Sequence, residues 1–154
     1  MGYISDNLLS DEKIGYIGKL HWIIFLWPCI FIVIALLLFS GGKESAQGGI
    51  GFLIIGILLG VFRYITYSTS EFGITNKRVI IKVGFIRRRT LEMLLPKIET
   101  VGINQGILAR MLNYGTIVVV GSGGTREPFK KISEPLQFRQ KVLNEIVNVG
   151  KDKS

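Results

Sequence analysis

The sequence has very few of the residues that build catalytic and metal sites. Its 154 residues include one cysteine, Cys29, and one histidine, His21. A single thiol excludes a disulfide within the chain, and one cysteine with one histidine is too few for an ordinary metal site. Four glutamates of the second half are scattered, and none forms a recognisable pair for acid–base work: Glu92, Glu99, Glu127 and Glu134. We therefore expect no catalytic residues, no metal and no cofactor.

Charge is also scarce, at 19% of residues, below the roughly 25% that is usual for soluble domains. Apolar residues gather instead in two runs, Trp22–Phe39 and Ile50–Ile65. The first run carries no charge, and as a helix it would be about 27 Å long, close to the hydrocarbon thickness of a bilayer. A signal peptide fits poorly, because a polar segment precedes this run and no small-residue cleavage site follows it. The pattern predicts a transmembrane hairpin over residues 21–67, with helices at about 22–39 and 50–66.

The segment between the two runs, Ser40–Gly49, is polar and rich in glycine, which is typical of a connector. Within the second run, Gly56 and Gly60 stand one helical turn apart, a spacing that lets two membrane helices approach closely. Glycine is also simply common in membrane helices, and both interpretations stay open.

Basic residues near the ends of the two runs predict the orientation. The connector holds only Lys43, beside Glu44, whereas both flanks are basic: Lys13 and Lys19 before the hairpin, and Arg63, Lys77, Arg78 and Lys82 at its end and after it. Because cytoplasmic flanks carry the excess of lysine and arginine, we expect a multi-pass protein of the cell (inner) membrane with both termini in the cytoplasm. Residues 1–20 would then be a cytoplasmic N-terminal segment.

After the second run the pattern becomes that of a β-rich domain, expected over residues 68–150, with a loose tail at 151–154. Alternation from Tyr64 to Phe72 predicts a strand that continues the second helix. Further strands are expected at Val79–Val83, Phe85–Leu95, Val101–Gln105, Thr116–Val120 and Thr125–Lys130. An amphipathic helix over Ser133–Val149 would bury Leu136, Val142, Leu143, Ile146 and Val147. The fold class is α+β, a sandwich or small barrel closed by this helix.

The domain carries the whole formal net charge of +8, with 15 basic and 7 acidic residues after position 70. Two basic clusters stand out, the first at Lys77, Arg78, Lys82, Arg87, Arg88 and Arg89, and the second at Arg126, Lys130 and Lys131. They are either solvated charges on edge strands or a surface held against anionic lipid, where each is worth about 1 kcal/mol. Nucleic-acid binding is the weaker alternative, because exposed aromatic residues are not interleaved with these charges.

Several short motifs of the second half follow one another in an order that resembles a known family. They are Gly73-Ile74-Thr75-Asn76-Lys77-Arg78-Val79-Ile80, then Gly84-Phe85-Ile86-Arg87, then Leu95-Pro96-Lys97-Ile98-Glu99-Thr100-Val101, and then the stretch from Gln105 to Ile117. In these the chain resembles the bacterial pleckstrin-homology domain, in the form that has two transmembrane helices before one domain. The resemblance implies a pleckstrin-homology-like β-sandwich with a C-terminal helix, and it supplies no catalytic residues.

Three functions are compatible with these patterns. We expect a non-enzymatic, membrane-anchored binding or scaffold module that engages a membrane-protein partner, or a second copy of itself, beside anionic lipids. One alternative is a specific lipid-headgroup receptor with a pocket near Lys77, Arg78, Arg87 and Arg88. The other is a small subunit of a membrane transporter or enzyme complex, which would require oligomerisation because two helices cannot easily enclose a pathway.

Overall fold

The computed structural model describes residues 3–84 and 89–151, apart from the side chains of residues 43 and 44. The chain forms two compact units, a helical hairpin of Trp22–Ser68 and a domain made of Met1–His21 together with Thr69–Ser154. The hairpin is therefore inserted into the domain, whereas the sequence patterns predicted a domain that begins at residue 68. The difference arises because a strand in the N-terminal segment pairs with the first strand after the hairpin.

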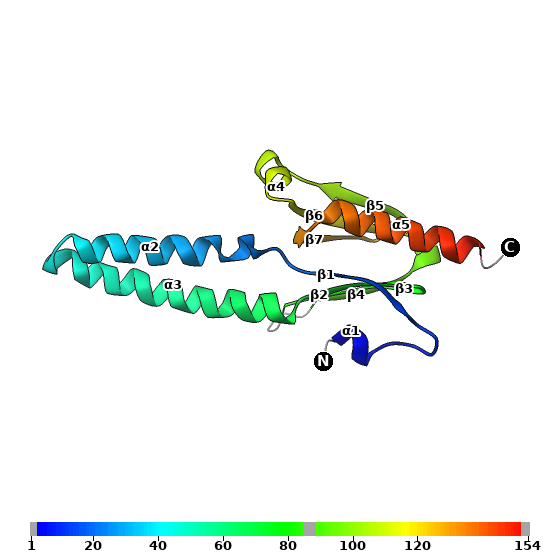
Figure 1. Ribbon diagram of the computed structural model, residues 1–154, viewed down its shortest axis with the longest axis horizontal. Coiled ribbons are helices and arrows are strands. Elements are labelled where there is room, and N and C mark those ends of the chain that lie inside the picture. Colours follow the sequence, from blue (N-terminus) through cyan, green and yellow to red (C-terminus); the bar gives the residue numbers. More distant parts are fainter. Residues whose placement is uncertain (1–2, 85–88, 152–154) are drawn as a thin grey trace. The chain divides into compact units, whose positions relative to one another are not determined.

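The hairpin consists of a short 3-10 turn, η1 (Trp22–Phe25), and two helices, α2 (Leu26–Ser40) and α3 (Lys43–Thr69) (Figure 1). The connector is shorter than the Ser40–Gly49 expected from the sequence, because α2 ends at Ser40 and α3 already begins at Lys43. Within that stretch Gly49 lies closely against α2, because a Cβ on it would be 3.2 Å from the carbonyl oxygen of Ala35. A Cβ on Gly56 would lie 3.0 Å from Ile32 Cγ1, whereas one on Gly60 would meet nothing closer than 3.8 Å.

Helix α3 continues to Thr69, so the strand expected from Tyr64 to Phe72 was wrong over most of its length. The threonine hydroxyl of Thr66 donates a hydrogen bond to the carbonyl oxygen of Phe62, 2.9 Å away and one turn earlier in the helix. At the open end of the hairpin, the rings of Phe25 and Tyr67 lie 5.7 Å apart. β-Branched and aromatic residues are thus accommodated in the last turns of this long helix.

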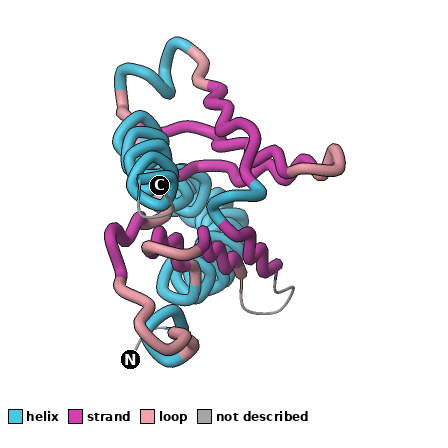
Figure 2. The backbone as a smooth tube through the Cα atoms, turned by 90° about the vertical axis from the view of Figure 1, so that its right-hand side faces the viewer, coloured by secondary structure: helices cyan, strands magenta, loops and turns pink. Residues whose placement is uncertain are grey.

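The domain contains two antiparallel sheets (Figures 1 and 2). The first has the order β1 (Ile14–Gly18), β2 (Glu71–Thr75), β3 (Arg78–Val83) and β4 (Arg89–Leu94), and the second has the order β5 (Ile98–Asn104), β6 (Tyr114–Gly121) and β7 (Arg126–Ser133). A 3-10 turn, η2 (Leu95–Lys97), joins them. The helices of the domain are α1 (Tyr3–Asp6), α4 (Ile107–Met111) and α5 (Pro135–Lys151). The sequence therefore predicted the two-sheet architecture and the C-terminal helix.

Aromatic contacts hold the layers of the domain together. The rings of Phe72 on β2 and Phe129 on β7 meet edge to face at 6.5 Å, and Phe138 of α5 meets Tyr16 of β1 at 6.2 Å. The surrounding core is aliphatic and includes Ile74, Val79, Ile81, Leu95, Ile117, Val119 and Ile132.

Helix α5 buries a different face from the one expected. Pro135, Phe138 and Val142 are buried, while Leu136, Leu143 and Val147 are 56%, 42% and 55% exposed. The prediction that Leu143 belongs to the core was wrong. The apolar residues of α5 occupy two faces of one helix, and the sequence did not indicate which of them packs on the sheets.

The chain leaves and rejoins the domain at one end of the sheets. The last residue of β1, Gly18, pairs with Phe72 near the start of β2, so both crossings between domain and hairpin lie side by side. His21, the last residue before the hairpin, donates its backbone N–H to the carbonyl oxygen of Lys131 at 2.7 Å. We call this the crossing end. It includes the end of β7 and the start of β6, because Tyr114 pairs with Ser133.

The opposite end of the sheets is called the far end. It holds the turn between β2 and β3, and the hairpin between β6 and β7 at residues 122–125. Helix α4 lies between the last residue of β5 and the first residue of β6, which places it at the crossing end.

Candidate functional site

The described members of the first basic cluster expected from the sequence lie at two ends of the first sheet. Strand β3 separates Lys77 and Arg78 at the far end from Lys82 at the crossing end. Arg89 is exposed at the crossing end, where it pairs with Val83. The remaining two members, Arg87 and Arg88, lie outside the described residues.

The guanidinium of Arg78 is engaged by groups of the domain itself. Its Nε lies 2.9 Å from Oε1 of Glu12, and its Nη1 lies 2.7 Å from Oε2 of Glu92. Its Nη2 also donates to the carbonyl oxygen of Asn7 at 2.6 Å. The structure thus gives Arg78 a structural role, since its donors already bond two carboxylates and a carbonyl.

Glu12 is the buried partner in this arrangement, and its side chain is fully inaccessible to solvent. Burial by itself would raise the pKa of this carboxyl, but hydrogen bonds from Arg78, from the Leu9 N–H and from the Thr75 hydroxyl outweigh it and lower the pKa. The Leu9 nitrogen and the Thr75 hydroxyl lie 2.6 and 2.7 Å from the carboxylate oxygens. The carboxylate is therefore held ionised.

The motif residues Thr75–Arg78 together hold the N-terminal segment, and we call this arrangement the N-terminal clasp. Asn76 Oδ1 accepts from the Lys13 N–H at 2.9 Å, and the Lys77 ammonium donates to the carbonyl oxygen of Ser10 at 2.5 Å. The Thr75 hydroxyl accepts the backbone N–H groups of residues 77 and 78, which closes the turn. The most recognisable motif of the sequence is thus structural, and it anchors residues 7–13 to the far end.

Lys82 also contacts the N-terminal segment. Its ammonium lies 4.2 Å from the centre of the Tyr3 ring, and it pairs in register with Glu71 on β2. The Glu71 carboxylate accepts the backbone N–H groups of Tyr3 and Ile4 at 2.9 and 3.1 Å. Helix α1 is therefore fixed over sheet β1–β4 by charge and by cation–π attraction.

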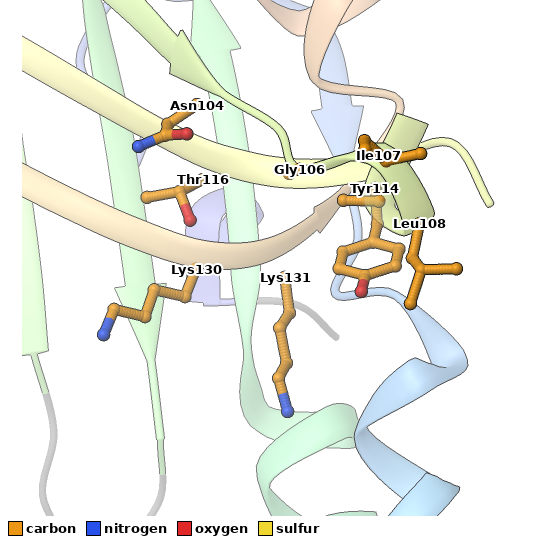
Figure 3. Close-up of a pocket in the computed structure, with 10 residues that line it drawn as sticks. Asn104, Gly106, Ile107, Leu108, Tyr114, Thr116, Lys130 and Lys131 are labelled. Carbon is orange, nitrogen blue, oxygen red and sulfur yellow. The ribbon is translucent and has the colours of Figure 1, made fainter. Parts of the chain in front are cut away.

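The second basic cluster is divided as well. Arg126 lies at the far end beside Val120, whereas Lys130 and Lys131 lie at the crossing end. These two lysines are consecutive, and neighbouring strand residues normally point to opposite faces. A register irregularity in this pairing and a left-handed backbone at Lys131 (φ 61°) turn both ammonium groups to the same side, as Figure 3 shows.

An open cavity of about 530 Å³ lies beside the two lysines. Its other lining residues come from the end of β5, from α4 and from the start of β6, and they include Asn104, Leu108, Tyr114 and Thr116. In Figure 3 the Tyr114 hydroxyl and the Leu108 side chain point the same way as the Lys131 ammonium. The cavity combines an apolar wall with two cations.

Helix α4 forms that apolar wall, and it exposes large side chains. Ile107, Leu108 and Met111 are 84%, 70% and 77% exposed, and the next residue, Leu112, is 40% exposed. This surface was not predicted from the sequence. The signal was present, because the four residues stand at i, i+1, i+4 and i+5 around the single small residue Ala109.

His21 connects α4 to the start of the hairpin. It is buried, its ring stacks on Tyr114 at 5.1 Å between centres, and it hydrogen-bonds the backbone of Leu112. Burial lowers the pKa of this imidazole, and the hydrogen bond to Leu112 opposes that change only in part. His21 is therefore a packed residue of the crossing end.

Within residues 3–84 and 89–151, no three histidine, cysteine, aspartate or glutamate side chains come together in a way that would hold a metal ion. Cys29 lies in the hairpin on an exposed face of α2.

Comparison with known proteins gives one match. The family model described as "Bacterial PH domain" matches residues 20–146, which includes both the hairpin and most of the domain. No curated protein and no solved structure matches the chain. The match agrees with the two antiparallel sheets and the C-terminal helix.

Proposed function

Because the chain belongs to the bacterial PH domain family, we propose that it is a non-enzymatic binding or scaffold protein anchored in the cell membrane by its helical hairpin. Its domain lies on the cytoplasmic side, against the anionic lipids of the inner leaflet. There it engages a membrane-protein partner or a second copy of the chain.

The exposure of the hairpin supports the membrane anchor and is the observation that carries the proposal. Trp22–Ser40 and Ser45–Thr69 are long and apolar enough to cross a bilayer. Yet only 22% and 11% of their most apolar 18-residue stretches are buried inside the protein. A core helix of a soluble protein would be mostly buried. Large apolar side chains such as Leu37, Ile54 and Phe62 instead face outward along both helices, where lipid would cover them.

The pairing of β1 with β2 supports the placement of both termini on one side. These strands precede and follow the hairpin, and they hydrogen-bond as neighbours from Gly18↔Phe72 onward. A chain that crosses the bilayer between two paired strands must cross it an even number of times. The charge pattern of the flanks then favours the cytoplasm as the shared side.

The exposed face of α5 supports a partner-binding surface. Leu136, Leu143 and Val147 are separated by seven and four residues, which is the spacing of one seam of a coiled coil. Gln140 occupies the remaining seam position, where a polar residue typically selects the partner and the register. A second copy of α5 is the occupant that we propose, because this seam is complementary to itself.

Single-cysteine variants of the full chain in a Cys29→Ser background test the two halves of this proposal. Ser45→Cys in intact cells should react with an impermeant thiol reagent, whereas Ser122→Cys at the far end of the domain should not. In inverted membrane vesicles under mild oxidation, Leu143→Cys should form a disulfide-linked dimer, with Ser122→Cys as the matched exposed control.

The outcomes distinguish the orientation of the membrane anchor from self-association through α5. Reaction at Ser122→Cys from outside would overturn the orientation, and with it the placement beside the inner leaflet. Equal cross-linking at Leu143→Cys and Ser122→Cys would show random collision, and would overturn self-association through α5 while leaving the anchor intact.

A further inference from the structure

Helix α4 turns its large apolar residues outward, on the side that a soluble protein would leave to polar residues. A surface helix normally turns its large apolar residues inward and its small or polar ones outward. In α4 the inward residue is Ala109, which is 8% exposed, and the outward residues are Ile107, Leu108, Met111 and Leu112. Water would meet most of the surface of these side chains, so the arrangement calls for an apolar medium or partner.

The backbone holds α4 firmly in this orientation. Asn113 ends the helix in the left-handed conformation (φ 56°), and its carbonyl oxygen accepts the Glu134 N–H at 3.0 Å. Before the helix, the Gln105 side-chain amide donates to the carbonyl oxygen of Tyr114 at 2.8 Å. The neighbouring Gly115 has no room for a Cβ, which would lie 2.7 Å from Gln105 Cγ. Hydrogen bonds and close packing on both sides of α4 therefore hold its exposed residues in this orientation.

Three cations lie on or beside this surface. Arg110 is exposed on α4 itself, Lys130 is exposed on β7, and the bulge turns Lys131 to the same side as Lys130. Tyr114, an amphipathic ring, lines the same cavity. Large apolar side chains beside cations and a tyrosine are the composition of surfaces that lie in the headgroup region of anionic bilayers.

The position of α4 in the domain indicates which bilayer is within reach. His21 immediately precedes the first apolar helix, and it contacts α4 and its neighbours through Leu112, Tyr114 and Lys131. The exposed residues of α4 therefore belong to the end of the domain from which the chain continues into the hairpin. A membrane that holds the hairpin has its surface at this end.

We propose that α4 is a membrane-inserting element, which places Ile107, Leu108, Met111 and Leu112 at the headgroup–acyl boundary of the bilayer that holds the hairpin. Arg110, Lys130 and Lys131 lie against anionic headgroups beside it. This inference rests on the proposed membrane anchor and adds a second, separate contact with the lipid.

Fluorescence quenching on the full chain tests this inference. Single cysteines in a Cys29→Ser background would carry an environment-sensitive fluorophore at Leu108→Cys on α4, at Thr125→Cys at the far end, and at Leu37→Cys in the hairpin. The protein would be reconstituted into vesicles of phosphatidylcholine and phosphatidylglycerol. A lipid with a nitroxide near the top of its acyl chain reports insertion, and aqueous iodide reports exposure to water.

We expect the label at position 108 to be quenched by the nitroxide lipid and protected from iodide, and the label at position 125 to show the reverse. Quenching at position 37 but equal exposure to iodide at 108 and 125 would overturn the insertion of α4 and leave the anchor standing. Protection at 108 from both quenchers would mean that protein covers α4, which also overturns the inference. If position 37 itself escapes the nitroxide lipid, the membrane anchor fails, and the inference fails with it.

A charge variant checks the role of the lysines. Lys130→Gln should lower the ratio of inserted to water-exposed label at position 108 about fivefold, as expected for one cation near an anionic surface. Lys97→Gln at the far end is the matched control and should leave the ratio unchanged. Equal effects of the two variants, or no loss in Lys130→Gln, would contradict the proposed contact with anionic headgroups.

Discussion

Val142 and Leu143 are neighbours on α5 with opposite surroundings, which makes them a sharp test of the packing of the domain. Val142 is fully buried, whereas Leu143 is 42% exposed. Val142→Ala removes two carbon atoms from a packed core, and at about 0.8 kcal/mol per buried methylene with an added cavity penalty it should cost about 2–3 kcal/mol. Leu143→Ala removes more carbon, but from the surface of the single chain, and in the monomer it should change the free energy of unfolding by less than about 0.5 kcal/mol.

A temperature series with a brief protease pulse measures this difference on the full chain in mild detergent, since unfolding of the domain exposes it to cleavage. For a domain of roughly 100 residues, 1 kcal/mol shifts Tm by about 4–8 °C, so Val142→Ala should lower the midpoint by roughly 10–20 °C. Leu143→Ala should stay near the wild-type midpoint. Equal shifts, or a larger shift at Leu143, would refute the orientation of α5 and with it the proposed partner surface.

Two further predictions concern the N-terminal clasp. Arg78→Ala leaves the Glu12 carboxylate buried without its cation, so it should cost about 3–5 kcal/mol by the same assay, and adding Glu12→Gln should recover part of that loss. Strictly additive losses would contradict the coupling. Because the pKa of Glu12 is lowered in the folded chain, its stabilising contribution is complete above its ordinary pKa and is lost as the pH falls through the lowered value. The wild-type midpoint should therefore fall more steeply in acid than that of Glu12→Gln, and parallel pH profiles would contradict this account.

The strands after residue 75 could be predicted from the sequence because local patterns specify them. Glycine and asparagine mark the turns, β-branched runs mark Val79–Val83 and Thr116–Val120, and the motifs match one family over most of the chain. The hairpin was predictable for the same reason, since two long apolar runs that together carry a single charge, Arg63, are typical of membrane helices.

The features that the sequence did not reveal depend on contacts between distant segments. Strand β1 has a weak pattern of its own, Ile-Gly-Tyr-Ile-Gly, and exists because β2 offers it an edge. Alternation at Tyr64–Phe72 indicated a strand, but the residues before Glu71 continue the helix, because residues with β propensity follow their tertiary context.

The candidate site was the least predictable part, because charge alone does not tell a binding residue from a structural one. Arg78 and Lys77 are bonded within the N-terminal clasp, while Lys130 and Lys131 come together only through a bulge. Each of these outcomes depends on the partner that folding supplies, such as Glu12, which is 66 positions from Arg78.

The insertion of the hairpin between β1 and β2 has a consequence for folding during synthesis. During translation β1 emerges from the ribosome first, and it has no partner strand until the whole hairpin has been made. A mature hairpin brings its two ends together, as the 5.7 Å contact of Phe25 with Tyr67 shows, and so raises the effective concentration of β1 at β2. Membrane insertion would then act as the first folding step of the water-exposed domain, and a chain whose helices fail to insert would leave the β2 edge open to unrelated strands.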